Sequence, residues 1–212
     1  MTEEIEQGTD DWFAARLGRV TASRVADVVA KTKSGYGASR GNYMSQLLCE
    51  RLTGTVADSY TNAAMQHGID TEPQARAAYE FFRDAEVTQV GFANHPRIAM
   101  AGASPDGLIH GDDLGLVEIK APNTATHLDT LLSEKVPTKY ITQMQWQMAC
   151  TGAKWCDFVS FDNRLPAEHS FFCQRVDRDD ERIEDLETEV EKFLTELSEK
   201  IEQLNSRLET KE

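Results

Sequence analysis

The sequence predicts an α/β fold in which a β-sheet is flanked by helices and followed by a long C-terminal helix. Segments with apolar residues at spacings of three and four alternate with short runs of β-branched and other apolar residues. A turn-rich hairpin at 104–120 lies mid-chain, and a nearly continuous helical pattern occupies 179–209. The 212 residues are enough for one core with an appended helix. We therefore expect a domain over 1–176 and a helix over 177–212 that packs on it.

Two short helices are expected near the N-terminus. Thr9 is a typical helix cap, and Gly18 is a typical stop. A second helix is expected to start at Thr21. The free N–H groups at that start, with Arg16 upstream and Ser23 in the first turn, would form a phosphate cradle. A capped surface helix with a solvated arginine explains the same residues equally well.

A basic loop and two helices are expected next. The loop, 31–40, contains glycines and is of the kind that stays mobile until it meets a phosphate backbone, but a plain linker also fits. Helical spacing predicts one helix over 43–52, which ends at Gly54. It predicts another over 61–82, with a break near Gly68.

Strand patterns lead into the central hairpin. Residues 87–92 and 98–101 are predicted strands. Ile109 then precedes the turn residues 110–113, and the β-rich run 116–119 follows them. The chain therefore reverses direction between two paired arms.

The hairpin carries a candidate metal site. Because side chains alternate along a strand, Glu118 and Lys120 share one face, and Val117 and Ile119 point into the core on the other. Asp106, at the start of the opposite arm, can lie across from Glu118. Two carboxylates beside one lysine can hold a hard divalent cation and activate a water next to it. A turn followed by a solvated strand face remains the alternative interpretation.

The remaining elements of the domain are two helices and two strands. The helices are expected at 126–132 and 138–150, and the strands at 155–161 and 170–176. On the second of these helices, Gln143 and Gln147 are one turn apart and so share a face. These amides could be functional or simply the solvated side of the helix.

The last helix, 179–209, has an apolar stripe. Its inner half is expected to pack on the domain, and past about Leu197 little chain is left to cover it. We expect a protruding end that meets another subunit or protein. A helix folded back on its own domain is the alternative.

Composition limits the function classes. The net charge of −14 weakens a nucleic-acid interpretation without excluding it, because a local cleft can differ from the whole surface. The four cysteines form no C-x-x-C pair, which disfavours a zinc or iron–sulfur site. No apolar run is long enough to span a membrane, and the first residues are acidic. A cytosolic protein is expected.

Five blocks in consistent order between about Gly8 and Val176 resemble a known family. They are Asp11-Trp12 with Arg16-Leu17-Gly18 and Thr21-Ala22-Ser23; Gly68-x-x-x-Glu72; Ser104-Pro105-Asp106-Gly107-Leu108; Glu118-Ile119-Lys120 with Pro122; and Tyr140-x-x-Gln143-x-Gln145. Together they resemble the lambda-type phage exonucleases, also called alkaline exonucleases or YqaJ-like viral recombinases, of the PD-(D/E)XK nuclease superfamily. The chain departs from the pattern at His67, where an aromatic residue is usual.

The resemblance implies a PD-(D/E)XK core with a mixed central β-sheet and a specific activity. It implies a Mg²⁺-dependent 5′-to-3′ exonuclease on linear double-stranded DNA that releases 5′-mononucleotides and leaves 3′ overhangs for recombination by strand annealing. Two Mg²⁺ ions are implied, with Mn²⁺ as a substitute. It also implies a ring-shaped homotrimer, a single-strand annealing protein as partner, and a phage or prophage protein in the bacterial cytoplasm.

The resemblance also implies roles for individual residues. Asp106, Glu118 and the backbone carbonyl of Ile119 correspond to metal ligands. Lys120 corresponds to the residue that orients or deprotonates the attacking water, and Glu72 to a supporting acid. The residues that correspond to the pocket for the 5′-phosphate are Arg16, Ser23, Ser104 and Gln143.

Other functions remain open on the sequence alone. An endonuclease or a helicase-associated nuclease of the same superfamily would share the hairpin. A non-catalytic recombination adaptor that uses the C-terminal helix is the alternative from another class, and the intact Asp106, Glu118 and Lys120 argue against it.

Overall fold

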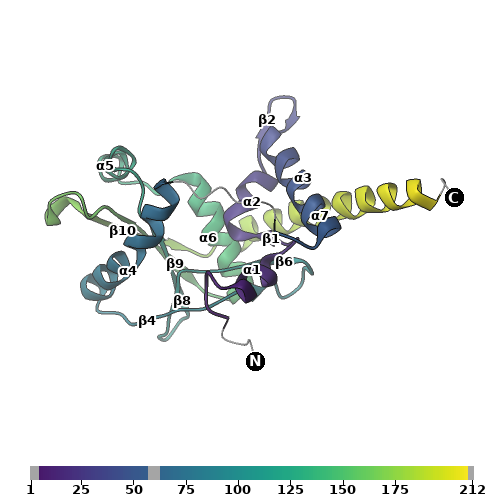
Figure 1. Cartoon of the computed structure of the whole chain (residues 1–212). Helices are drawn as coiled ribbons and strands as arrows, with labels where there is room; N and C mark the ends of the chain where they lie inside the picture. The colour runs from purple at the N-terminus through teal and green to yellow at the C-terminus, as the bar shows by residue number, and fades with distance from the viewer. Residues whose placement is uncertain (1–4, 57–62, 210–212) are drawn as a thin grey trace.

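The computed structural model describes residues 5–56 and 63–209 and has a five-stranded mixed sheet between helices (Figure 1). The strand order is β10-β9-β8-β7-β4, and only the β8–β9 pair of this sheet is parallel. The strands are β4 (Val87–Thr88), β7 (Gly107–Ile109), β8 (Gly115–Lys120), β9 (Trp155–Phe161) and β10 (Phe171–Asp177). The predicted fold class, with a mixed sheet and flanking helices, is confirmed.

A smaller sheet joins the N-terminal segment to the chain before the hairpin. Its order is β1 (Val20–Thr21), β6 (Ala101–Ala103) and β5 (Ala93–Asn94). The strand predicted at 98–101 is therefore shifted, because residues 96–100 form a turn in which Met100 has a φ of 61°. The strand predicted at 87–92 is interrupted where the backbone of Ile5 passes so close to Gly91 that no Cβ would fit there.

Seven α-helices and a short 3₁₀ helix, η1 (Ala167–His169), are seen in the described residues. They are α1 (Asp10–Arg16), α2 (Ala22–Val28), α3 (Ala38–Thr53), α4 (Ala63–Arg83), α5 (Thr124–Ser133), α6 (Thr138–Thr151) and α7 (Asp180–Glu209). The side chain of Thr9 accepts from the Trp12 N–H, as a cap should. Thr21 precedes α2 but makes no side-chain cap hydrogen bond.

Two predictions in the N-terminal half are wrong. The segment predicted as a loop contains a hairpin of β2 (Lys31–Thr32) and β3 (Gly35–Tyr36), because Glu189 of α7 accepts from both Lys31 and the Tyr36 hydroxyl. Helix α4 continues through Gly68, where a break was expected. The start of that helix predicted at Thr61 lies outside the described residues.

Helices cover both faces of the large sheet. Tyr79 of α4 packs with Val117 and Ile119 on one face, and Met144 and Met148 of α6 pack with Leu116 on the other. Strand β8 is consequently buried over its first five residues. The alternative of a solvated strand face is therefore wrong, and the charge of Glu118 lies inside the protein.

The inner half of α7 belongs to a third core, with α2 and α3. Leu186, Val190, Phe193 and Leu197 are buried there, and Phe193 stacks on Tyr43 with ring centroids 5.7 Å apart. The outer end of α7 projects away from the body (Figure 1), and Leu204 is 38% exposed. What this end contacts stays a prediction. No helix of the described residues is long and apolar enough to cross a membrane.

The same substitution at two places on α7 should have different effects on stability. Leu197→Ala should lower the free energy of unfolding by about 2–5 kcal/mol, because it removes a fully buried side chain. Leu204→Ala, two turns further along, should lower it by less than about 1 kcal/mol.

Urea unfolding of both variants at one protein concentration measures the difference. Equal losses of stability would mean that the outer end of α7 is covered in solution, contrary to its exposure here.

Candidate active site

The β7–β8 hairpin brings Asp106 and Glu118 together. Gly107 pairs with Val117, so the residue before β7 lies beside Glu118 on β8. The Oδ2 atom of Asp106 accepts a hydrogen bond of 2.6 Å from the backbone N–H of Ile119. The arrangement predicted from strand alternation is therefore present.

Glu118 is fully buried and is held by three side chains. Gln143 and Gln147, one turn apart on α6, donate to its Oε1 and Oε2 atoms at 2.6 Å each. Lys120 makes an ion pair with Oε1. A buried carboxylate costs several kcal/mol unless it is paired and hydrogen-bonded, and these three groups supply that compensation.

The pKa values of Asp106 and Lys120 are both shifted by their surroundings. Burial raises the pKa of Asp106 well above its usual range, and the charge of Glu118 raises it further. Burial on its own would lower the pKa of Lys120, but the charges of Glu118 and Asp106 outweigh it and raise that pKa. A divalent cation bound between the two carboxylates would favour the charged form of Asp106.

The donor set fits magnesium or manganese. Hard divalent cations bind carboxylate and carbonyl oxygens, and Asp106, Glu118 and the carbonyl of Ile119 are of that kind. Across the residues described, no group of three or more His, Cys, Asp and Glu side chains is arranged to hold a metal. The roles of Asp106, Glu118 and the Ile119 carbonyl as metal ligands stay predictions.

Glu72 lies on α4 near this centre. Its charge contributes to the raised pKa of Asp106, although less than burial and Glu118 do. Its own side chain pairs with Arg76, one turn later on the same helix. This position suits a supporting acid better than a primary ligand.

A second cluster forms around Ser104, two residues before Asp106. The Oγ atom of Ser104 accepts from Arg16 at 3.1 Å and from the Trp12 indole at 2.9 Å. The guanidinium of Arg16 lies 4.2 Å from the centre of the Trp12 ring. Burial lowers the pKa of Arg16. A half-buried guanidinium beside a hydroxyl is a suitable anion site.

The other two predicted phosphate-binding residues make different contacts. Ser23 is exposed on α2, with its hydroxyl 3.4 Å from that of Thr21. Gln143 is bound to Glu118. Within residues 5–56 and 63–209, no hydrogen bond joins Ser23 or Gln143 to Arg16 or Ser104. The structure thus brings together two of the four.

Three residues that shape the site were not assigned a role from the sequence. Gln147 donates to Glu118, and its one-turn spacing from Gln143 was the sequence feature that could have indicated this. Gln147 is buried, so the alternative of a solvated side of the helix is wrong. Trp12 is one of the residues that carry the family resemblance, but the resemblance assigned it no role in the site. Gln7 donates at 2.8 Å to the carbonyls of Pro105 and Val90 and so fixes the loop between the clusters, which no sequence pattern indicated.

Comparisons with known proteins agree with this geometry. The family model of the YqaJ-like viral recombinase domain matches residues 11–154. An alkaline exonuclease (LHK-Exo) from Laribacter hongkongensis is 54% identical over 96% of this chain and 100% of its own, with a TM-score of 0.89. The structure of LHK-Exo in complex with dAMP has the same identity and coverage and a TM-score of 0.90. A search of curated proteins gives no match.

A more distant structure supports the fold alone. A phage-related exonuclease from Haemophilus somnus 129PT is 16% identical over 90% of this chain and 96% of its own, with a TM-score of 0.69. The family match and the 54% identical relative confirm the resemblance found in the sequence. The chain therefore belongs to the YqaJ-like viral recombinase family, as a nuclease of phage-type recombination.

Proposed function

We propose that the protein is a Mg²⁺-dependent 5′-to-3′ exonuclease on linear double-stranded DNA. It releases 5′-mononucleotides and leaves 3′ overhangs for recombination by strand annealing. The observation that carries this proposal is the pairing of the buried Glu118 with the half-buried Asp106 beside Lys120, with Asp106 two residues from Ser104 of the Arg16–Ser104 cluster. The binding of dAMP, a deoxynucleoside monophosphate, by the 54% identical relative supports the proposed product.

Asp106, Glu118 and the Ile119 carbonyl would hold the cations, two Mg²⁺ ions for which Mn²⁺ substitutes. Bound there, they supply positive charge to the attacking and the leaving oxygen of the phosphodiester. Gln143 and Gln147 keep the Glu118 carboxylate in one orientation. Glu72 adds negative charge at the edge of the site.

Lys120 orients the attacking water. While no cation neutralises the two carboxylates, the pKa of Lys120 is raised. Lys120 is then an ammonium group and donates a hydrogen bond to an oxygen atom. Neutralising those carboxylates removes the interaction that holds its proton, which brings Lys120 closer to acting as a base.

Arg16 and Ser104 would bind the terminal 5′-phosphate, and Ser23 and Gln143 would complete the pocket. Gln143 contacts Glu118, so it stands between the catalytic carboxylate and the proposed pocket. Binding a new 5′-phosphate after each cut would advance the strand by one nucleotide.

The proposal includes a ring-shaped homotrimer and a single-strand annealing protein as partner. With a net charge of −14, the protein needs a way to retain DNA that does not depend on a broadly basic surface. A closed ring retains DNA topologically. The projecting end of α7 is a suitable contact for a subunit or for the annealing protein.

Asp106→Ala and Lys120→Ala should each reduce digestion of linear duplex by about a thousandfold or more, because each removes a group at the reacting centre. Binding to DNA ends, measured by fluorescence anisotropy, should persist. The exposed Lys135→Ala is the matched control and should digest normally. Normal digestion by either site variant would refute the assignment.

Removing the 5′-phosphate from a linear duplex should slow initiation about tenfold, because a charge-assisted contact is lost. In Arg16→Ala the two substrates should be digested at equal rates. Arg19→Ala, whose side chain contacts Asn94 instead, should keep the preference. A wild-type protein indifferent to the phosphate would argue against the pocket.

Metal affinity should increase with pH. The raised pKa of Asp106 means that a proton competes with the cation over a higher pH range than at an exposed aspartate. As pH rises through that pKa the proton leaves, so Mn²⁺ should bind more tightly. Calorimetric titration without DNA, at mildly acidic and alkaline pH, tests this. The same pH dependence in Asp106→Asn would contradict it.

A further inference from the structure

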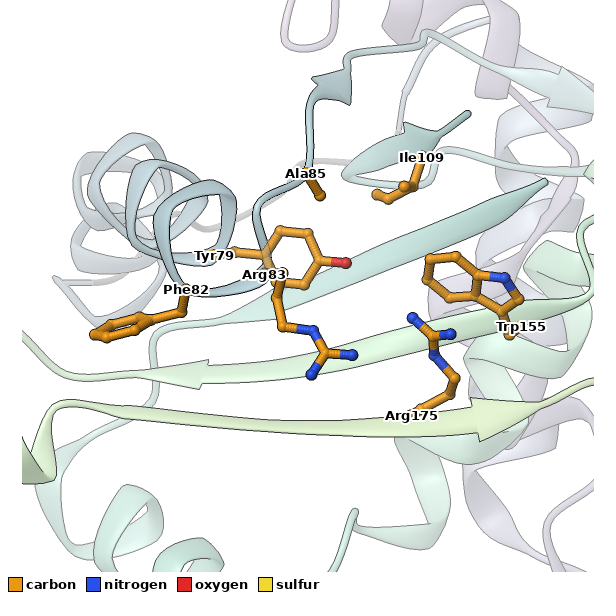
Figure 2. Close-up of a pocket in the computed structure, with 7 residues that line it drawn as sticks. All are labelled: Tyr79, Phe82, Arg83, Ala85, Ile109, Trp155 and Arg175. Atoms are coloured by element: carbon orange, nitrogen blue, oxygen red, sulfur yellow. The ribbon is translucent and has the colours of Figure 1, made fainter. Parts of the chain in front are cut away.

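A pocket of about 280 Å³ opens on the α4 face of the sheet (Figure 2). It lies between the C-terminal end of α4, the end of β7 and the start of β9. Figure 2 shows the guanidinium groups of Arg83 and Arg175 approaching each other across it, beside the Trp155 indole. The side chains that matter for its chemistry are Tyr79, Phe82, Arg83, Ile109, Trp155 and Arg175.

This pocket is separate from the active site. Trp155 pairs with Gly115 at the start of β8, and Lys120 is at its other end. Five residues of strand correspond to about 16 Å. The pocket also lies on the face covered by α4, whereas Glu118 is bound from α6 on the opposite face.

The buried carboxylate of Asp157 fixes one of the two arginines. It accepts from Arg175 at 2.8 and 3.0 Å and from the Tyr79 hydroxyl at 2.9 Å. The guanidinium of Arg175 also lies 3.5 Å from the centre of the Trp155 ring. Arg175 is therefore held in place before any ligand arrives.

The guanidinium of Arg83 makes fewer contacts with other side chains than that of Arg175 does. In the described part of the chain its guanidinium has one ionic contact, at 3.5 Å from Asp157. The side chains of Arg83 and Arg175 are 43% and 42% exposed. Two arginines share one buried carboxylate, and Asp177 is the other acid acting on Arg175. Arg83 thus keeps donors available for an anionic group.

The surroundings favour a protein partner over DNA. Phe81 and Phe82 next to the pocket are 81% and 59% exposed, and Phe82 contacts Phe171 with ring centroids 4.9 Å apart. Exposed aromatic residues with arginine are typical of protein interfaces. The exposed acids Asp84 and Glu86 follow on the same segment, so positive charge is confined to the two arginines of the pocket, which suits one or two carboxylates better than an extended phosphate backbone.

We propose that this pocket binds an acidic segment of a partner protein that ends in a bulky apolar side chain. The carboxylates pair with Arg83 and Arg175, and the apolar side chain lies against Phe82, Ile109 and Tyr79. Charge-assisted bonds to arginine fix the direction of the segment, and aromatic contact adds affinity. Because the pocket lies away from the catalytic carboxylates, a bound partner leaves DNA digestion possible.

A fluorescein-labelled peptide with two aspartates, a glycine and a C-terminal phenylalanine is the probe. Its anisotropy on titration with the wild-type protein should show saturable binding. Arg83→Glu should weaken that binding at least tenfold, because attraction becomes repulsion. Lys135→Glu makes the same charge change at an exposed position outside the pocket and should bind the peptide normally. Both variants should digest linear duplex at the wild-type rate.

Three results would overturn the proposal. They are no saturable binding of the peptide; equal binding by Arg83→Glu; and equal binding of a peptide in which both aspartates are replaced by asparagine. A duplex that competes with the peptide at this pocket would instead assign it to nucleic acid. A change of oligomeric state in Arg83→Glu, seen by light scattering, would assign it to contact between copies of this chain.

Discussion

The buried carboxylate of Glu118 is the interaction on which the arrangement of the site depends. A charge enclosed by protein is tolerated only where enough donors reach it, and here two amides of α6 and the ammonium group of Lys120 do so. The same contacts fix α6 against β8 and place Asp106 beside a second negative charge. In the proposed function, the requirements of folding and of cation binding would therefore meet in one side chain.

The loop before β7 contributes to two different side-chain clusters within three residues, 104–106. Ser104 is turned toward Arg16 and Trp12, and Asp106 toward the backbone of Ile119. Gln7 holds the Pro105 carbonyl between them. If both proposed sites bind as we propose, an anion site would lie next to a cation site, as required of an enzyme that recognises a strand end and cuts beside it. The arginine–aromatic pocket lies at the other end of the sheet, where binding does not block this path.

Local patterns predicted the hairpin well, because turn residues and strand alternation depend on neighbours in the sequence. They did not show that both faces of β8 are buried, or that Gln143 and Gln147 contact a residue 25 and 29 positions away. The break predicted near Gly68 is absent because one glycine lowers helix propensity too little to end a helix, and α4 continues into residues 75–79, which pack on the sheet. The phosphate-binding role proposed for Arg16 was indicated by the local helix start, whereas its combination with Ser104 came from family resemblance, since residues 88 positions apart give no local signal of contact.

The central claim is that Asp106 and Glu118 form one cation site beside Lys120. Anomalous diffraction from crystals of the protein grown with Mn²⁺ tests it most directly. We expect an anomalous peak bonded to oxygen atoms of Asp106 and Glu118, and the loss of that peak in Asp106→Asn. Manganese bound only elsewhere, or an unchanged peak in the variant, would contradict it.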